Sequence, residues 1–386
     1  MEPDFYNLWS ELSEEEQLIF QTVQDLVASE FMPVINTHYE NGTFPTELIP
    51  RLGALGLLGA GLPENASGSG VSPVGYGLIM QELEAGDSGL RSFASVQGGL
   101  VMYPIWRYGS PEQKARWLPQ LTSGKAVGCF GLTEPEAGSN PGGMTTRAHR
   151  TAKGWELNGR KMWITNGTIA DVAVVWAKDD GGNVRGFLVE ANREGFSAPQ
   201  MHGKLSLRAS VTSELILDKV IIPEANRLPD AKGLKAPLSC LTQARYSIAW
   251  GVIGAAMRCY NIALDYALER HQFSRPIAGY QLTQKKLVDM LEEITRAQWL
   301  TFRLARLKTQ GKMTFDQVSL AKRNNVAMAR NIARSAREIL GANGIMEEYE
   351  IMRHLANLET VYTYEGSHEM HTLIIGEKIT GLKAFD

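Results

Sequence analysis

The chain has 386 residues, which is long enough for two or three domains, or one large unit, with a substantial buried core. With 44% hydrophobic and 21% charged residues, its composition excludes an intrinsically disordered chain. A net charge of −3, from 39 Lys and Arg against 42 Asp and Glu, lacks the basic footprint of a nucleic-acid-binding or anionic-membrane-binding protein.

The first third of the sequence is predicted to be helical. Ser13 and Glu16 form a capping box, and hydrophobic residues follow at helical spacing. Pro33 is expected to end that helix, because proline has no N–H to donate and its ring clashes with the preceding turn. Further helical stretches continue to about residue 124. We assign residues 1–126 to an N-terminal α-helical domain.

From about residue 126 the hydrophobic period changes to that of strands. Asn158-Gly159 lies between two short hydrophobic runs and predicts a β-hairpin. Residues 180–182, Asp-Gly-Gly, predict a second hairpin, and residues 213–223 predict another pair of strands. Several short strands at close spacing indicate a middle β domain over residues 127–235, built as a small barrel or sandwich.

Long helices return after about residue 236. Three segments, 246–273, 283–310 and 315–341, each exceed the usual length of a globular helix. Long helices with short connections predict a C-terminal four-helix bundle over residues 236–386. The order helix, strand, helix indicates an α+β protein and argues against a Rossmann fold, in which strands and helices would alternate.

The cysteines and the N-terminal segment bear on the compartment. Cys129, Cys240 and Cys259 are too few and too scattered for a disulfide framework or a zinc site, which indicates a reduced compartment. The acidic N-terminal segment lacks the features of a signal or transit peptide, and no hydrophobic run is long enough to cross a bilayer. We expect a cytoplasmic protein without membrane insertion, with the mitochondrial matrix as the alternative if a leader was removed.

Two short patterns suggest chemistry but lack the necessary context. Residues 86–89, Gly-Asp-Ser-Gly, match the surroundings of a serine-protease nucleophile, yet they fall in a predicted helical region. His368 and His371 are three residues apart and could share a helix face as metal ligands. Without a third ligand at motif spacing, we expect no metal site here.

Residues 129–144 form the most unusual segment, rich in glycine and hydroxyl side chains at the start of the β region. Such a loop lets backbone groups approach a flat or phosphorylated ligand closely, although a plain Gly/Pro turn would have the same composition. Trp163 and Thr165 follow and could offer an aromatic face and a hydroxyl to the same ligand.

Four stretches, in this order and at these separations, resemble motifs of the acyl-CoA dehydrogenase family: "CFGLTEPEAGSN", "WITNG", "ERHQFSRPI" and "TYEGSHEMH". The resemblance covers nearly the whole chain. It implies an FAD-dependent enzyme with helical, β and helical domains. Further stretches, "ELEAGDSGLRSFASVQGGLVMYPI" and "KLSLRAS" among them, are similar to the glutaryl-CoA-oxidising members of the family.

The resemblance implies a catalytic base. Glu365 matches the carboxylate that removes the α-proton of a CoA thioester, while the β-hydrogen leaves as hydride to the flavin. That chemistry needs a carboxylate in a site dry enough to raise its basicity. Gly366 leaves room for the thioester, whose carbonyl is polarised in the family by the base's own N–H and a flavin ribose hydroxyl. Some relatives carry the base on another helix, where this chain has Ala244.

The flavin contacts are likewise implied by the resemblance. Leu132 and Thr133 would lie at the pyrimidine side, and Arg270 would reach the pyrophosphate in a neighbouring subunit. Asn140 stands where the family commonly has Asp. The implied cofactor-binding residues are Phe130, Gly131, Leu132, Thr133, Glu134, Gly138 and Ser139 in the loop; Trp163, Ile164 and Thr165 along the isoalloxazine; Arg270, Phe273 and Gln281 from a neighbouring subunit; and Glu338, Ile339, Leu340, Gly341, Ala342, Ser367 and Glu369 at the adenosine end.

Substrate choice depends on Arg91. A buried guanidinium would be costly in an acyl pocket without an anionic partner, and the distal carboxylate of glutaryl-CoA is one such partner. Ser92 and Ser95 could add hydrogen bonds. Arg91 could also pair with Glu84, seven residues earlier on the same helix face. The two pairings are compatible, since the resemblance matches Glu84 to a carboxylate of the glutaryl site.

The resemblance also implies how the substrate is held and processed. In decarboxylating members Glu84, Arg91 and Tyr364 act with Glu365, so that a glutaconyl intermediate loses carbon dioxide as a dienolate and gives crotonyl-CoA. The CoA-thioester portion would contact Ser139, Leu238, Ser239, Cys240, Leu241, Thr242, Gln243, Ala244, Arg245 and Gly366.

The sequence therefore predicts an FAD-dependent glutaryl-CoA dehydrogenase activity with decarboxylation, passing electrons to electron-transfer flavoprotein from a homotetramer. The alternatives are a short-chain acyl-CoA dehydrogenase or oxidase on the same fold. From another class, the alternative is a flavin-bound nucleic-acid or stress protein without dehydrogenase activity.

Overall fold

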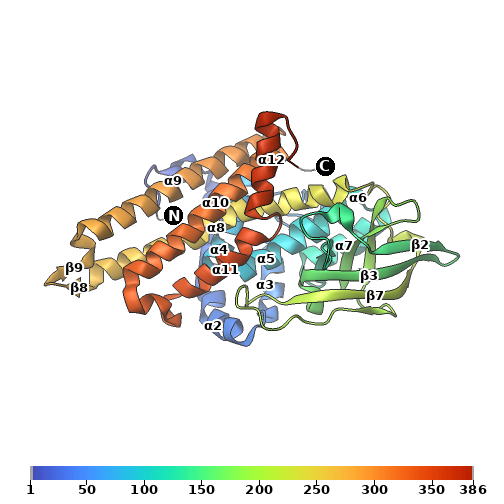
Figure 1. The fold of residues 1–386 in the computed structure, drawn as a ribbon, viewed down its shortest axis with the longest axis horizontal. Helices are drawn as coiled ribbons and strands as arrows, with labels where there is room; N and C mark the ends of the chain where they lie inside the picture. Colours follow the sequence, from blue (N-terminus) through green and yellow to red (C-terminus); the bar gives the residue numbers. More distant parts are fainter. Residues whose placement is uncertain (1–2, 385–386) are drawn as a thin grey trace.

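The computed structural model describes residues 3–384, in which a curled sheet lies at one end of the molecule beside a large body of helices (Figure 1). The predicted α+β class and the predicted order of helical, β and helical regions are confirmed. Within residues 3–384, no helix is both long enough and apolar enough to span a membrane.

The N-terminal region is a set of helices around a buried core. Ser13 caps the first of them in a capping box with Glu16, as predicted. The helices are α1 (Glu14–Leu26), α2 (Met32–Asn41), α3 (Ile49–Ala54), α4 (Pro73–Gly86), α5 (Ser88–Ser95), α6 (Tyr103–Tyr108) and α7 (Pro111–Thr122).

The prediction that Pro33 ends the first helix is wrong. A π-helical turn, Val27–Phe31, joins α1 to α2, and Pro33 lies in the first turn of α2. The N–H of Met32 donates to the carbonyl of Val27, five residues earlier, so the chain stays helical through a widened turn that accommodates Pro33, which has no N–H. A second π-helical segment, Val96–Met102, joins α5 to α6.

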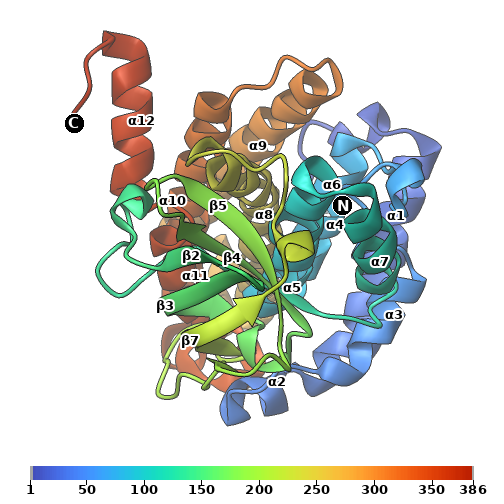
Figure 2. The same ribbon diagram turned by 90° about the vertical axis from the view of Figure 1, so that its right-hand side faces the viewer.

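The middle region is one sheet of seven strands in the order β1-β4-β2-β3-β7-β6, with β5 paired to β4. β1 and β2 run parallel to β4, and the other pairs are antiparallel. The sheet curls into an open half-barrel, seen in front of the helices in Figure 2. The strands are β1 (Gly128–Gly131), β2 (Arg147–Thr151), β3 (Gly154–Thr165), β4 (Val172–Lys178), β5 (Val184–Glu190), β6 (Phe196–Ser197) and β7 (Thr212–Ile222).

Only one of the predicted hairpin turns is a turn. Residues 180–182 join β4 to β5 as predicted. Asn158-Gly159 instead lies inside the continuous strand β3, opposite an irregularity in β7 where Lys219 has a φ of 53°. The N–H of Lys219 donates to Asn158 Oδ1 at 2.9 Å. Residues that tolerate turn geometry also tolerate a β-bulge, so the same sequence signal has two structural outcomes.

The C-terminal region contains the predicted long helices, in which α10 packs against α8, α9 and α11. The hydrophobic positions Leu287, Met290 and Ile294 are buried along α9. A two-stranded arm, β8–β9, projects where α8 meets α9, at the opposite end of the molecule from β2 and β3 (Figure 1). The elements are α8 (Lys235–Glu269), β8 (His271–Gln272), β9 (Arg275–Pro276), α9 (Gln281–Thr309), α10 (Phe315–Leu340), α11 (Ile351–Thr363) and α12 (His368–Thr380).

Candidate active site

Glu365 lies in a tight turn between α11 and α12. Tyr364 follows the last residue of α11, and Ser367 caps α12 by accepting a hydrogen bond from the N–H of Met370. Glu365 has a φ of 54°, a left-handed conformation that is uncommon for a residue with a side chain. Gly366 has a φ of 93°, and a Cβ there would lie 2.9 Å from Nε2 of His371. The turn therefore needs glycine after the glutamate.

Two cationic side chains hold the carbonyls of this turn. Lys322, on α10, donates to the carbonyl oxygens of Tyr364 and Gly366, each at 2.7 Å. Arg245, on α8, donates through Nε to the carbonyl oxygen of Glu365 at 2.8 Å. Two helices of the bundle thus fix the backbone around the glutamate, which stabilises its unusual φ.

The carboxylate of Glu365 is suited to accept a proton. Its Oε2 atom is buried and has no hydrogen-bond partner among the described residues. Burial raises the pKa of the Glu365 carboxyl above its ordinary value of 4.5, and the charges of Arg91, Lys322 and Arg245 oppose that rise. A desolvated carboxylate without hydrogen bonds is a stronger base than a solvated one.

Beside this turn is a buried polar cluster built around Arg91. Arg91 Nε donates to Glu84 Oε2 at 2.7 Å, and Nη2 donates to Glu84 Oε1 and to the hydroxyl of Tyr364. Ser92 Oγ lies 3.1 Å from the same hydroxyl. Burial raises the pKa of Tyr364 to about 12, so the tyrosine is neutral at physiological pH.

The prediction that Glu84 and Arg91 pair is confirmed, but not their predicted place on one helix face. Asp87 is extended and separates α4, which carries Glu84, from α5, which carries Arg91. Asp87 accepts hydrogen bonds from Arg353 and Asn357 of α11, both at 2.8 Å. This contact ties the helix break to the helix that leads to Glu365.

One nitrogen atom of the Arg91 guanidinium, Nη1, is not used in the bonds of this cluster. Among residues 3–384, no hydrogen bond or ion pair engages Nη1 of Arg91. Ser95, one turn further along α5, is bonded to Ser247 with 2.5 Å between the hydroxyl oxygens. The bonds inside the cluster are therefore made by Nε and Nη2 of Arg91.

Gly251 on α8 gives a direct test of this cluster. A Cβ at Gly251 would lie 2.1 Å from Oε2 of Glu84 and 3.1 Å from Nε of Arg91, so Gly251→Ala must displace the buried pair. We expect the overpacking to lower the free energy of unfolding by about 1–3 kcal/mol, measured by denaturant titration. Gly376→Ala, on α12, is the matched control because nothing lies within 4 Å of its Cβ. Equal stability of the two variants would contradict the tight packing.

A second group of predicted residues lies where β3 ends. Trp163 has a φ of 63°, and its side chain is 57% exposed, which is unusual for a tryptophan. Just beyond it, Asn166 Nδ2 and Thr168 Oγ1 are buried polar atoms without a partner among the described residues. Unpartnered buried polar groups beside an exposed aromatic face are typical of a ligand site.

The loop after β1 is fixed from within by Glu134. Its carboxylate accepts from Lys161 Nζ at 2.8 Å and from the N–H and hydroxyl groups of Thr145 and Thr146. Glu134 was predicted to contact the cofactor, but its carboxylate is engaged by these protein groups, and its N–H and carbonyl are hydrogen-bonded to Ala137. Phe130 and Leu132, which precede it, belong to the core cluster that joins the sheet to the N-terminal helices.

The remaining predicted cofactor residues lie away from this loop. Arg270 and Phe273 are exposed on the β8–β9 arm, with Phe273 91% exposed, and Gln281 starts α9 beside it. Within one chain the arm is far from β3 (Figure 1), so these residues do not join the site at Trp163. The residues at the end of α10 and in the following turn are Glu338, Ile339, Leu340, Gly341 and Ala342.

The segment predicted to contact the CoA thioester begins α8. Arg245 reaches the turn at Glu365, and the neighbouring Ala244 is buried. Ser239 is hydrogen-bonded to Tyr108 at 2.7 Å, and Gln243 accepts from Lys308 at 3.1 Å. The start of this segment therefore contacts α6 through Ser239, whereas its end contacts the turn at Glu365 through Arg245.

Sequence reasoning missed the role of Lys322. The residue is 1% exposed and lies on the buried stripe of α10, with Val318, Asn325 and Ala329 four, three and seven residues away. A lysine on such a stripe was a signal that it has a partner. His371 is buried against Gly366, and no group of three or more His, Cys, Asp or Glu side chains in residues 3–384 could hold a metal.

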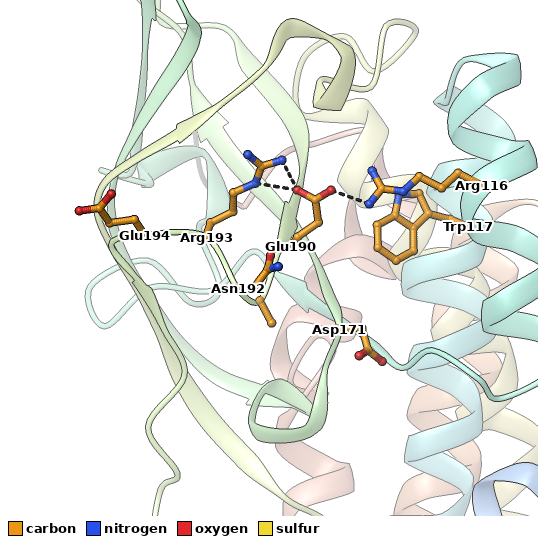
Figure 3. Close-up of a pocket in the computed structure, with 8 residues that line it drawn as sticks. Arg116, Trp117, Asp171, Glu190, Asn192, Arg193 and Glu194 are labelled. Carbon is orange, nitrogen blue, oxygen red and sulfur yellow. Dashed lines mark hydrogen bonds and ion pairs between the residues drawn. The ribbon is translucent and has the colours of Figure 1, made fainter.

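An open cavity of about 670 Å³ lies elsewhere, between α7 and the end of β5 (Figure 3). Glu190 lies between Arg116, at 2.7 Å, and Arg193, whose Nε is at 2.6 Å. Asp171 accepts from the N–H of Val127 at 2.8 Å. The charge of Glu190 is therefore balanced by two arginines, in a contact that joins α7 to the end of β5.

The chain belongs to the acyl-CoA dehydrogenase family. The profiles of that family's N-terminal, middle and C-terminal domains match residues 13–125, 129–220 and 231–380. The human mitochondrial short-chain specific acyl-CoA dehydrogenase is 34% identical over 95% of this chain and 90% of its own.

Two solved structures from Mycobacterium smegmatis are more similar. A glutaryl-CoA dehydrogenase has 54% identity and a TM-score of 0.96 over 98% of each chain. A glutaryl-CoA dehydrogenase in complex with FADH2 has 50% identity and a TM-score of 0.97, covering 99% of this chain and 98% of that one.

Proposed function

We propose that the protein is an FAD-dependent glutaryl-CoA dehydrogenase that also decarboxylates its substrate to crotonyl-CoA. The observation that carries the proposal is the buried Arg91, with Nη1 unpartnered, bonded to the tyrosine that precedes Glu365. A fatty acyl chain would offer nothing to this guanidinium, whereas the distal carboxylate of a glutaryl group would pair with it.

Family membership and the residues at the end of β3 support FAD as the cofactor. An exposed Trp163 and the unpartnered atoms of Asn166 and Thr168 fit a flat, polar-edged ring. When bound, FAD supplies the electron-accepting chemistry, because it takes up the β-hydrogen of the substrate together with two electrons. Trp163, Ile164 and Thr165 would hold the ring, with the backbone from Phe130 to Thr133 and the loop residues Gly138 and Ser139.

Proton transfer belongs to Glu365. It removes the α-proton of the thioester, and the freed electron pair forms the new double bond as the β-hydrogen leaves. The N–H of Glu365 donates to the thioester oxygen and stabilises the charge that develops there. The absence of a side chain at Gly366 leaves room for the thioester.

Decarboxylation follows at the polar end of the cluster. Arg91 holds the distal carboxylate, with Ser92 and the Tyr364 hydroxyl beside it. The bond to that carboxylate breaks, carbon dioxide leaves, and the electrons delocalise toward the thioester before Glu365 returns a proton. Glu84 keeps Arg91 oriented throughout.

We propose a homotetramer, because the arm that carries Arg270 and Phe273 is too far from β3 to serve the same chain's flavin. In a neighbouring subunit, Arg270, Phe273 and Gln281 would reach the cofactor. Residues 338–342, Ser367 and Glu369 would contact its adenosine end. Electron-transfer flavoprotein is the proposed electron acceptor.

The pH dependence tests the base. Burial raises the pKa of Glu365 above 4.5, so the carboxyl is protonated and inactive below that raised pKa and becomes an effective base above it. We expect kcat/KM for glutaryl-CoA to rise with pH along a limb centred above 4.5 and then level off. A limb at or below 4.5 would contradict the assignment. Glu292→Gln, an exposed carboxylate on α9, should leave the limb unchanged.

The substrate is tested by steady-state assays with an artificial electron acceptor. We expect kcat/KM for glutaryl-CoA to exceed that for butyryl-CoA by about 100-fold or more, since a buried charge pair discriminates by several kcal/mol. A preference for butyryl-CoA would favour the short-chain alternative, which the 34% identity to the human enzyme keeps open. Release of hydrogen peroxide in air would favour an oxidase.

A further inference from the structure

Three successive carbonyl groups around the proposed base are held by two cationic side chains. Lys322 engages the carbonyls of Tyr364 and Gly366, and Arg245 engages that of Glu365. Lys322 is 1% exposed, so its ammonium group is removed from water and depends on these bonds. An apolar side chain at this position could not donate these two hydrogen bonds to the backbone carbonyl oxygens.

Lys322 makes no direct ion pair with the base, although its charge lowers the pKa of the Glu365 carboxyl through space. Among the ion pairs of residues 3–384, none joins Lys322 to the carboxylate of Glu365. Oε2 of Glu365 also lacks a hydrogen-bond donor. The hydrogen bonds of Lys322 thus go to the backbone on either side of Glu365, and none of them goes to the carboxylate.

The direction of one N–H group follows from the planarity of the peptide bond. In a trans peptide the carbonyl of one residue and the N–H of the next point in opposite directions. By holding the carbonyl of Tyr364, Lys322 turns the N–H of Glu365 away from itself. That N–H donates to no acceptor within the described residues, so it remains available to a ligand.

We propose that Lys322 is a positioning residue that aims the N–H of Glu365 at the thioester carbonyl oxygen. The assignment rests on the proposed function, in which that N–H stabilises the developing charge. The adjoining peptide, Glu365–Gly366, is held by Arg245 through the Glu365 carbonyl, so both peptides that flank the Cα with the φ of 54° are fixed. Lys322 acts through the backbone and does not touch the substrate.

The test combines kinetics with the vibration of the bound carbonyl. Crotonyl-CoA labelled with ¹³C at its thioester carbonyl is bound to the FAD-loaded enzyme, and its C=O stretch is measured by difference infrared spectroscopy. For Lys322→Met we expect the lowering of that frequency seen in the wild type to shrink by half or more. We expect kcat to fall by about 10- to 100-fold, because a misdirected oxyanion donor is weakened rather than removed. KM should change far less.

Two further variants complete the design. Lys322→Arg keeps the charge and donors and should restore part of both the frequency shift and kcat. Lys285→Met, an exposed lysine on α9 outside the site, should match the wild type.

A wild-type C=O frequency in the FAD-loaded Lys322→Met protein would overturn the proposal, whatever the change in thermal stability. Failure of both variants to fold with FAD would assign Lys322 to stability alone and also overturn it. The proposed function fails separately, if the wild-type enzyme binds crotonyl-CoA but is not reduced by glutaryl-CoA.

Discussion

Glu365→Gln is expected to bind FAD and glutaryl-CoA but to lose turnover by about 10³-fold or more, because general base catalysis contributes up to about 10⁴-fold. Glutamine has nearly the same shape as glutamate, so the turn held by Lys322 and Arg245 should persist. The neutral amide has no lone pair basic enough to take an α-proton. Stopped-flow absorbance of the flavin after anaerobic mixing with substrate measures the loss.

The control for this variant is Glu377→Gln, the same chemical change at an exposed position on α12. It should reduce its flavin at the wild-type rate. Flavin reduction at the wild-type rate in Glu365→Gln would show that another residue is the base. Ala244 cannot fill that role, and the hydroxyl of Tyr364, with a pKa of about 12, is a poor candidate at neutral pH.

Arg91→Gln is expected to lower kcat/KM for glutaryl-CoA by about 100-fold or more while butyryl-CoA loses much less, because only the first substrate has a carboxylate to pair. The substitution also leaves Glu84 buried without its partner, and breaking a buried pair costs about 3–5 kcal/mol of stability. Kinetics with both substrates on the same preparation separates recognition from the fraction of folded enzyme.

The double variant Glu84→Gln/Arg91→Gln removes both charges and avoids the unpaired carboxylate. We expect it to regain stability relative to Arg91→Gln, as measured by thermal unfolding, without regaining the preference for glutaryl-CoA. Equal losses for the two substrates in both variants would remove Arg91 from recognition of the distal carboxylate.

The sequence predicted the region order and the contact between Glu84 and Arg91, because both depend on local signals. The change from helical to strand period near residue 126 is visible in the hydrophobic pattern, and a buried arginine needs a carboxylate nearby. The break between the two helices was less accessible, since Asp87 is held extended by Arg353, 266 residues away in the chain. A contact at that separation leaves no local trace.

Strand boundaries failed for a related reason. Asn158-Gly159 is a sequence typical of turns, but strand β3 continues through it because a bulge maintains its pairing with β7. That pairing depends on the tertiary fold and not on the local sequence. The role of Lys322 likewise depends on the fold, which brings α10 against the turn at Glu365. Cofactor and substrate residues matched by the resemblance remain predictions, apart from the contacts described for the turn and the Arg91 cluster.

The most direct test of the central claim is an anaerobic mixture of the FAD-loaded protein with glutaryl-CoA, followed by flavin absorbance and by the mass of the product. We predict loss of the oxidised flavin absorbance and formation of crotonyl-CoA. Loss of absorbance with glutaconyl-CoA as the final product would retain oxidation and remove decarboxylation. No loss of absorbance with glutaryl-CoA, together with rapid loss with butyryl-CoA, would contradict the assignment of Arg91 and the proposed substrate.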